Sequence, residues 1–388
     1  MNSAVGVSRT PVSQNSPLFP ERFRFIEPTL PPLEKVLGIY EPAYAQGTIT
    51  NASIVARFES AVAERLGVAH CVAVSSCTVG LMLVLRCLDL RGEIILPSFT
   101  FFATGHAAVW NGLQPVFADC DPHSWTIDVA DTENKITAET RAILAVHLYG
   151  NPCEVDLLER IAKKHELKLI FDAAHAFGSL RHGRPVGKFG DAEVFSLSPT
   201  KLLVAGEGGL VTTDDAVLAR RLRAGRNYGD LGAYDPELIG LNARMSEFNA
   251  ALGLAGLDLL DSKVARRNQI AEMYTNLLFG MPGLSFQQID ASNRSSFKDY
   301  SVCINAGSFG LSRDQIAEAL LAENIETKRY FYPPLHQQML YRQYYDRESD
   351  GLRNTAFISS GILSLPIYES LPDESIEKIA LAIARLAQ

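Results

Sequence analysis

The sequence has little that would suit a nucleic-acid partner or a membrane. Its 388 residues contain 36 Lys and Arg against 44 Asp and Glu, which gives a formal net charge of −8 and no net basic footprint. A basic patch is the usual electrostatic footprint of nucleic-acid binding and of attachment to anionic lipids. The sequence also has no apolar run of the roughly 20 residues that a membrane-spanning helix requires. We therefore expect neither nucleic acid nor a membrane as a partner.

The sequence also lacks the cysteine spacings of a disulfide framework or a zinc site. None of its six cysteines forms a CxxC pair, and all stand in apolar surroundings: Cys71, Cys77, Cys87, Cys120, Cys153 and Cys303. This usage predicts buried free thiols, no bound metal and a cytoplasmic location. Residues 1–20 are rich in Ser, Pro and Asn and have no apolar core of signal-peptide type, so we expect them to form a flexible tail.

What the sequence does have is a series of short apolar runs separated by segments of helix length. Runs such as Cys71–Val74, Glu93–Leu96, Ala142–Val146 and Leu167–Phe171 are too short and too uniformly apolar to be exposed amphipathic strands. Strands that are apolar throughout are buried on both faces. The pattern therefore predicts an α/β fold in which helices cover both faces of a mostly parallel sheet.

The pattern changes near Gly256, where we place a domain boundary. Beyond it we expect a long helix, a strand, a helix opened by a serine and a final helix, at Leu257–Tyr274, Asp299–Asn305, Ser312–Glu323 and Glu374–Leu386. A chain of this length is expected to form one large domain and a smaller one. We predict a large domain over residues 21–255 and a small α+β domain over residues 256–388.

Lys201 and Asp172 are the strongest candidates for chemistry. Lys201 has uncharged flanks, lies five residues after Ser196, and falls on the connection between two runs that could pair as antiparallel strands. Asp172 ends an apolar strand, where a carboxylate is costly unless it is paired. An acid at a strand end, followed by a lysine with a serine nearby, is an arrangement that can hold pyridoxal phosphate (PLP). On spacing alone, two alternatives remain open: Lys201 is a surface lysine, and Asp172 caps a helix.

Other side chains follow strand ends in the same way. The segment Ser75–Gly80, which includes Ser76, Cys77 and Thr78, leads from a strand into a helix, where amides and hydroxyls can bind phosphate or a serine can simply cap the helix. Phe101 could stack on a flat cofactor or belong to the core. His175 follows Asp172 by three residues and could touch the cofactor ring or be a structural histidine.

Taken together and in order, these motifs resemble those of the DegT/DnrJ/EryC1/StrS family of sugar aminotransferases. The resemblance covers about residues 47–366 and includes Gly47–Asn51, Ser75–Thr78, Pro97–Phe101, Pro115–Asp119, His147–Gly150, Asp172–Ala176, Phe195–Lys201, Gly206–Gly209, Gly240–Glu247 and Ser364–Pro366. It implies the type I fold of PLP-dependent transferases, with a sheet of the seven-stranded type in the large domain.

The resemblance also implies roles for individual residues. Lys201 would form the Schiff base with PLP and move the proton between substrate carbon and cofactor. Asp172 would hold the pyridine nitrogen, His175 would lie near the ring oxygen, and Phe101 would be the stacking aromatic. The cofactor would alternate between PLP and pyridoxamine phosphate. Lysine, rather than the histidine of the dehydrating branch of the family, argues for amino transfer.

Phosphate binding and assembly are implied in the same way. Ser76, the amide of Cys77, Thr78 and Ser196 would hold the cofactor phosphate. Asn242 stands at a position that reaches the phosphate of the neighbouring subunit, so the resemblance implies a homodimer with shared active sites. The family also places a segment like Lys328–His336 near the substrate, which makes Tyr330 and His336 candidate substrate residues.

Within the family, the sequence looks most similar to enzymes that aminate C4 of dTDP-4-keto-6-deoxy-D-glucose. We therefore expect transfer of an amino group from glutamate to a nucleotide-linked keto-sugar. Two alternatives stay open. One is an aminotransferase that acts on an aminocyclitol or another natural-product ketone. The other is a regulatory protein that binds PLP without turnover.

Overall fold

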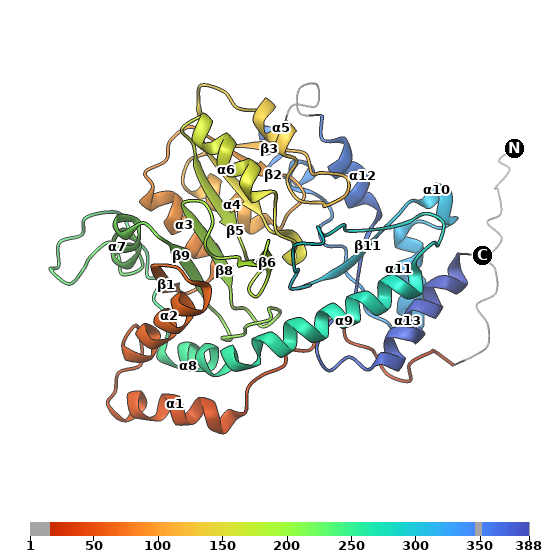
Figure 1. Ribbon diagram of the computed structural model, residues 1–388, viewed down its shortest axis with the longest axis horizontal. Helices are drawn as coiled ribbons and strands as arrows, with labels where there is room; N and C mark the ends of the chain where they lie inside the picture. The colour runs from red at the N-terminus through yellow and green to blue at the C-terminus, as the bar shows by residue number, and fades with distance from the viewer. Residues whose placement is uncertain (1–15, 346–350, 388) are drawn as a thin grey trace, which may run out of the picture.

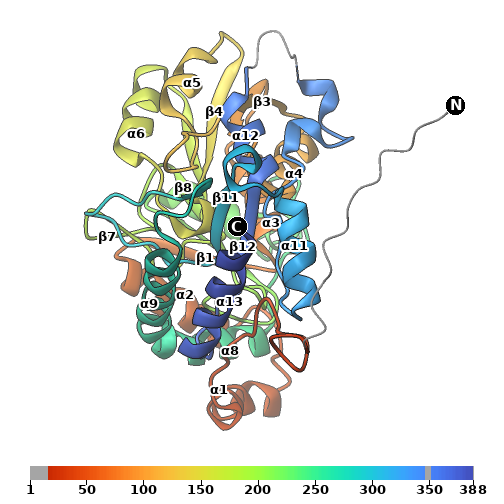
Figure 2. The same cartoon turned by 90° about the vertical axis from the view of Figure 1, so that its right-hand side faces the viewer.

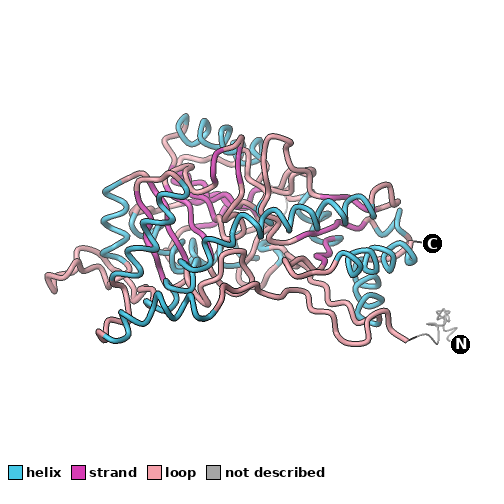
Figure 3. The backbone as a smooth tube through the Cα atoms, turned by 60° about the horizontal axis from the view of Figure 1, so that its bottom comes forward, coloured by secondary structure: helices cyan, strands magenta, loops and turns pink. Residues whose placement is uncertain are grey.

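The computed structural model describes residues 16–345 and 351–387. It contains a large seven-stranded sheet and, beside it, a smaller three-stranded sheet formed by the C-terminal part of the chain (Figure 1). The two groups of strands lie at separate places along the molecule, with helices around both (Figure 3). Within the described residues, no helix is long and apolar enough to cross a membrane. All six cysteines are free and buried, as their surroundings predict.

The large sheet has seven strands in the order β1-β9-β8-β5-β4-β2-β3. All run in one direction except β9, which is antiparallel to both of its neighbours. The strands are β1 (His70–Val74), β2 (Glu93–Pro97), β3 (Gln114–Ala118), β4 (Thr140–Val146), β5 (Lys168–Asp172), β8 (Ala192–Ser196) and β9 (Gly209–Thr213). The predicted mostly parallel sheet is confirmed, and so is the antiparallel pair on whose connection Lys201 lies.

Helices cover both faces of this sheet, because its strands are apolar on both sides. In β5, Leu169 and Phe171 join one buried cluster and Ile170 joins the other. The first cluster is closed by α1 (Leu33–Ala45), α2 (Ser53–Leu66), α6 (Val155–Lys164) and α8 (Glu247–Gly256), and the second by α3 (Cys77–Cys87), α4 (Phe102–Trp110) and α7 (Ala216–Gly225). The short helix α5 (Val129–Asn134) and the two-stranded ribbon of β6 (Leu180–Arg181) and β7 (Arg184–Pro185) complete this part of the chain, and the ribbon is separate from the seven-stranded sheet.

The C-terminal sheet is antiparallel, in the order β10-β11-β12, and the long helix α9 links it to the large sheet (Figure 1). Its helices α11 and α13 lie beside β11 and β12 in the side view (Figure 2). The elements are α9 (Leu260–Leu278), β10 (Leu284–Phe286), β11 (Tyr300–Ile304), α10 (Ala306–Phe309), α11 (Arg313–Ala322), α12 (Arg353–Gly361), β12 (Ile362–Leu365) and α13 (Asp373–Leu386). The elements predicted beyond Gly256 are all present, and Ser312 caps α11 through a capping box.

The N-terminal segment differs in part from the predicted tail. Residues 1–15 of that prediction lie outside the described residues. In the rest, Leu18 N donates a hydrogen bond to Glu323 Oε2 at 2.7 Å, and Phe19 is buried in the C-terminal cluster. Burial of the Phe19 ring stabilises the position of this segment. The Ser- and Pro-rich composition of residues 1–20 does not reveal this single apolar contact.

Glu247 ties helix α8 to the start of α2. Helix α2 has no side-chain cap of its own, since the residue at the N-cap position is Ala52. The fully buried carboxylate of Glu247 fills this role: Oε1 accepts from Ala52 N at 2.8 Å and Val55 N at 3.1 Å, and Oε2 accepts from Ile54 N at 2.8 Å. A negative charge at a helix N-terminus also meets the positive end of the helix dipole.

We predict that Glu247→Gln lowers the free energy of unfolding by about 1.5–3 kcal/mol, because an amide offers one acceptor oxygen where the carboxylate offers two. Urea unfolding followed by circular dichroism measures the change. The exposed Glu64 of the same helix provides the control, since Glu64→Gln should change the free energy by less than about 0.5 kcal/mol. Equal unfolding midpoints for the two variants would contradict the capping role.

Candidate active site

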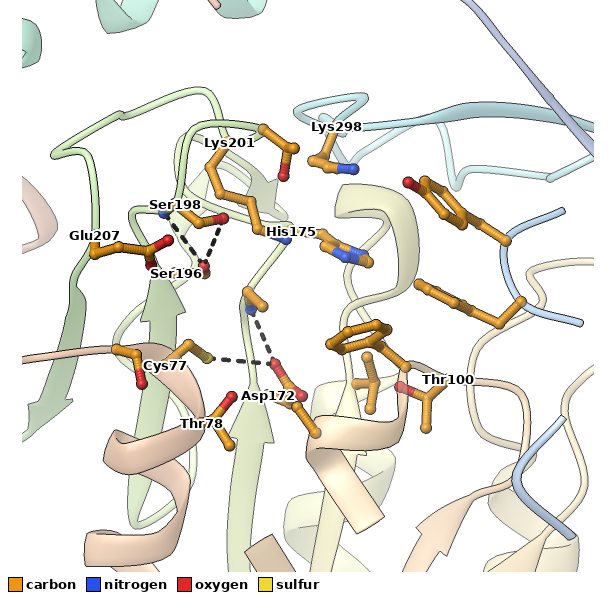
Figure 4. Close-up of a pocket in the computed structure, with 18 residues that line it drawn as sticks. Cys77, Thr78, Thr100, Asp172, His175, Ser196, Ser198, Lys201, Glu207 and Lys298 are labelled. Carbon is orange, nitrogen blue, oxygen red and sulfur yellow. Dashed lines mark hydrogen bonds between the residues drawn. The ribbon is translucent and has the colours of Figure 1, made fainter. Parts of the chain in front are cut away.

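The carboxyl ends of the parallel strands open into a cavity of about 360 Å³ between the large sheet and the C-terminal part (Figure 4). Ligands of open α/β sheets bind at this edge. Most residues that the sequence singles out line this cavity: Ser76, Cys77, Thr78, Phe101, Asp172, His175, Ser196, Lys201 and Tyr330. They come from segments far apart in the chain, so the fold brings together what the sequence only places in order.

Asp172 ends β5 and is buried at the bottom of the cavity as Figure 4 is drawn. Thr104 Oγ1 donates a hydrogen bond to its Oδ2 at 2.7 Å, and Ala174 N donates to Oδ1 at 3.1 Å. Burial raises the pKa of Asp172, and these two hydrogen bonds oppose that shift. The carboxylate is thus oriented, and a cationic partner in the cavity would stabilise its charged form further.

Lys201 reaches the cavity from the connection between β8 and β9. The residue is half-buried, and burial lowers the pKa of its amine to about 8, helped by the positive charge of Lys298. Asn249 of α8 fixes the β8–β9 connection, because its Nδ2 donates hydrogen bonds to Ala205 O at 2.5 Å and to Glu207 O at 2.8 Å. Lys201 therefore presents an amine that is neutral far more often than that of an exposed lysine.

One end of the cavity is rich in amides and hydroxyls. Helix α3 begins at Cys77, and the Oγ of Ser76 caps it by accepting from Val79 N at 3.2 Å, so the predicted cap and the predicted site coincide. A Cβ on Gly209 would lie 2.7 Å from Cys77 N, which shows how closely β9 approaches this turn. Ser198 and Thr200, which the sequence reasoning missed, line the cavity together with Ser196. Such a set of donors at a helix N-terminus suits a phosphate group.

His175 presents a defined face to the cavity. Tyr149 N donates to its Nδ1 at 3.1 Å, so the hydrogen of the neutral ring is on Nε2. Burial lowers the pKa of His175 well below its usual value, and the charges of Lys201 and Lys298 act in the same direction. The ring also lies parallel to that of Phe331, with 6.0 Å between centroids. His175 is therefore a neutral donor rather than a cation.

Two candidates lie away from the cavity. His336 does not line it: the residue is buried behind β2, where Ser98 Oγ and His336 Nδ1 are 2.7 Å apart, because Leu335 and His336 pack against the segment after that strand. Asn242 is exposed and lies outside the cavity of its own chain, bridged to Asn227. Phe101 stands at the mouth with 42 % of its surface exposed.

The structure adds residues that the sequence reasoning missed. Thr104 lies on α4, and its Oγ1 is 3.1 Å from that of Thr100, which precedes the helix; no local pattern in the sequence marks Thr104 as a partner of Asp172. Lys298 comes from the C-terminal part, as does Phe331, which lies within the segment Lys328–His336 that the resemblance placed near the substrate. No local pattern marks Lys298 as a cavity residue, since its place depends on how the two parts of the chain pack.

Comparison with known proteins identifies the family. The model of the DegT/DnrJ/EryC1/StrS aminotransferase family matches residues 37–384. The chain is 35% identical over 355 residues to a dTDP-4-amino-4,6-dideoxy-D-glucose transaminase of Escherichia coli, covering 91% of this chain and 95% of that protein. It is 37% identical over 330 residues to a UDP-N-acetyl-3-dehydro-alpha-D-glucosamine 3-aminotransferase of Acidithiobacillus ferrooxidans, covering 84% and 87%.

A solved structure extends the likeness to the fold. The structure of DesI, determined in the presence of its TDP-sugar product, superposes with a TM-score of 0.90 at 36% identity and covers 96% of this chain and 94% of that one. The predicted type I fold is thereby confirmed. The chain therefore belongs to the DegT/DnrJ/EryC1/StrS family of PLP-dependent aminotransferases and is a sugar aminotransferase.

Proposed function

We propose that the chain binds PLP through Lys201 and moves an amino group from glutamate to C4 of dTDP-4-keto-6-deoxy-D-glucose. The observation that carries the proposal is the meeting of Lys201 and Asp172 in one buried cavity, the first as an amine with a pKa of about 8 and the second as an oriented carboxylate. PLP, when bound, would supply an electron sink that eases removal of a proton from the carbon bearing the amino group.

The cavity residues fit PLP by the chemistry of their donors and acceptors. Asp172 would pair with the protonated pyridine nitrogen through a charge-assisted hydrogen bond. The turn at Ser76, Cys77 and Thr78 would hold the phosphate together with Ser196. The close approach of Gly209 to Cys77 N leaves this turn in one position. Preorganised donors of this kind need not move when an anion binds.

The remaining cavity residues would orient and protect the ring. His175 keeps its Nε2 hydrogen free to donate to the ring oxygen, because Nδ1 is already occupied by Tyr149 N. Phe101, at the mouth, could swing over one face of the ring and exclude water. Its neighbour Phe331 lies 5.8 Å away between ring centroids and continues the apolar wall.

Lys201 would also move the proton that amino transfer requires. A general base works best when its pKa lies near the working pH, since it then exchanges a proton in both directions. The pKa of about 8 meets this condition, whereas that of an ordinary lysine does not. Lys201 would take the proton from the donor carbon in the first half of the reaction and return one to the sugar carbon in the second.

Names of similar proteins support a sugar substrate and favour an enzyme over a regulatory protein. The Escherichia coli relative is named for a dTDP-linked 4-amino sugar, and DesI was solved with a TDP-sugar. The Acidithiobacillus relative is named for a UDP-linked 3-keto sugar at similar identity, so all three names support a nucleotide sugar, two of them support the dTDP linkage, and the Escherichia coli name supports C4. The aminocyclitol alternative has no counterpart among them.

A homodimer with shared sites completes the proposal. Asn242 is exposed and outside its own cavity, which leaves it available to a second copy of the chain. It lies on the bridge to Asn227, and Arg244 Nη1 donates to Asn227 Oδ1 at 3.0 Å, so the position of this segment is fixed. In a dimer, Asn242 of one copy would donate to the cofactor phosphate held by the other.

Cofactor-free protein should bond to PLP at Lys201, with a yield that rises with pH through about 8. Below that pH the amine is protonated and does not attack, and above it the amine is neutral. Reduction with borohydride fixes the bond, and peptide mass spectrometry locates and quantifies it. Lys201→Ala should abolish the labelled peptide, and Lys201→Arg should as well. Labelling of another lysine in the wild-type protein, or a midpoint near pH 10.5, would refute the assignment.

With glutamate as donor, kcat/KM for dTDP-4-keto-6-deoxy-D-glucose should exceed those for a UDP-linked 3-keto sugar and for a cyclitol ketone by about 10²-fold. Contacts that differ by a few groups produce discrimination of this order. NMR of the aminated product identifies the carbon and its configuration. A cyclitol ketone that reacts as fast as the dTDP-sugar would favour the aminocyclitol alternative, and a product aminated at C3 would correct the sugar assignment.

A further inference from the structure

Lys298 is the second lysine that lines the cavity of Lys201. It precedes β11, in the C-terminal part of the chain, and only 4% of its surface is exposed. Figure 4 draws it at the end of the cavity opposite Asp172, beyond Lys201 and His175. The charge of Asp172 and the charge of Lys298 therefore act on opposite ends of whatever occupies the cavity.

The backbone of Lys298 is held rigidly from both sides. Its N–H donates to Tyr149 O at 2.9 Å, and its carbonyl accepts from Arg267 Nη1 at 2.8 Å. Arg267 is itself almost fully buried and pairs with Glu369 Oε1 at 2.6 Å. A side chain supported in this way keeps its position when a ligand enters, which is what a binding group requires.

The ammonium of Lys298 still has capacity for a ligand. Its Nζ donates to Asp299 Oδ1 at 2.7 Å and lies 5.2 Å from the centroid of the Tyr330 ring. An ammonium has three N–H groups, and these contacts occupy two sides of it. Among the described residues, the buried Asp299 Oδ2 has no hydrogen-bond partner. The pair is buried but incompletely satisfied, and such a pair contributes little to stability compared with apolar side chains.

The amino donor is the substrate that needs a cation here. Lys201 and Lys298 are the two cationic side chains that line the cavity within the described residues, and Lys201 is committed to the cofactor under the proposed function. The two acids of the lining, Asp172 and Glu207, would repel a carboxylate. We propose that Lys298 binds a carboxylate of the amino donor. This inference rests on the proposed function and specifies how its first substrate is recognised.

Electrostatics agree with this position. The charge of Lys298 lowers the pKa of Lys201 and that of His175, so its field reaches the reacting amine.

The pair of Lys298 and Asp299 also explains how one cavity accepts two unlike substrates. When the sugar replaces the amino acid, Asp299 still balances the charge of Lys298, and no unpaired cation faces the hydroxyl groups. The ammonium of Lys298 can then donate hydrogen bonds to those hydroxyls.

Glutarate, a dicarboxylate without an amino group, is the probe for the test, because it can bind but cannot react. Calorimetry on the PLP-loaded protein should show that Lys298→Met weakens glutarate binding by roughly tenfold or more, since a buried charged hydrogen bond is lost. Lys298→Arg should retain most of the affinity. In a spectroscopic assay of the first half-reaction, Lys298→Met should slow L-glutamate about tenfold more than cyclohexylamine, because cyclohexylamine has no carboxylate and shares only the effect of the lost charge on Lys201.

Two further variants keep the test decisive. Lys298→Met leaves Asp299 without a partner, so the double variant Lys298→Met with Asp299→Asn removes both charges and should show the same selective loss. Lys378→Met, which removes an exposed lysine of α13, is the matched control and should bind glutarate as the wild type does. Undiminished glutarate binding in the double variant would overturn the inference, as would equal losses for glutamate and cyclohexylamine.

The two proposals fail in different ways. If the wild type bonds PLP at Lys201 and reacts with glutamate, while the Lys298 variants keep their affinity for glutarate, only the inference about Lys298 is wrong. If the wild type neither bonds PLP at Lys201 nor binds glutarate, both are wrong.

Discussion

The buried carboxylate of Asp172 is the constraint on which the site depends. A carboxylate at the end of a central strand loses most of its hydration, and burial raises its pKa accordingly. Two hydrogen bonds, from Thr104 Oγ1 and Ala174 N, fix its orientation without neutralising it. The group is therefore prepared for a cationic partner, and we propose that the protonated pyridine nitrogen of PLP is that partner.

The rest of the cavity is arranged around that acid by the sheet. Because β1, β2, β5 and β8 run in one direction, their carboxyl ends bring four features to one edge of the sheet: the turn at residues 76–78, Phe101, Asp172 and the connection that carries Lys201. The antiparallel β9 returns the chain after Lys201 and packs against the start of α3. The C-terminal part closes the cavity with Lys298, Tyr330 and Phe331. The site thus combines groups at the ends of the strands with groups that the packing of the C-terminal part brings beside them.

This division explains what the sequence could predict. Strands such as β4 and β5 are apolar throughout, so their existence and burial follow from composition, and the polar residues that follow them are placed at the sheet edge by topology alone. Asp172 and Lys201 were found in this way. The spacing of single residues left their roles open. The order of all the motifs along the chain, through its resemblance to the family, indicated those roles.

The sequence did not predict the location of residues that depend on contacts between distant segments of the chain. Lys298 looks like any lysine in a polar segment, and only the packing of the C-terminal part brings it into the cavity. His336 was expected near the substrate but is buried against Ser98, because the chain around it folds back on the segment after β2. Glu247 gives no local sign that it caps a helix nearly 200 residues earlier in the chain.

The most direct measurement of the central claim is the protonation state of the cofactor's ring nitrogen. Nitrogen NMR of the protein loaded with PLP labelled with nitrogen-15 reports this state through the chemical shift. We expect a protonated nitrogen in the wild type and an unprotonated one in Asp172→Ala at the same pH, because the buried carboxylate stabilises the positive charge. A ring nitrogen that is unprotonated in the wild type, or that stays protonated without Asp172, would contradict the role of this acid.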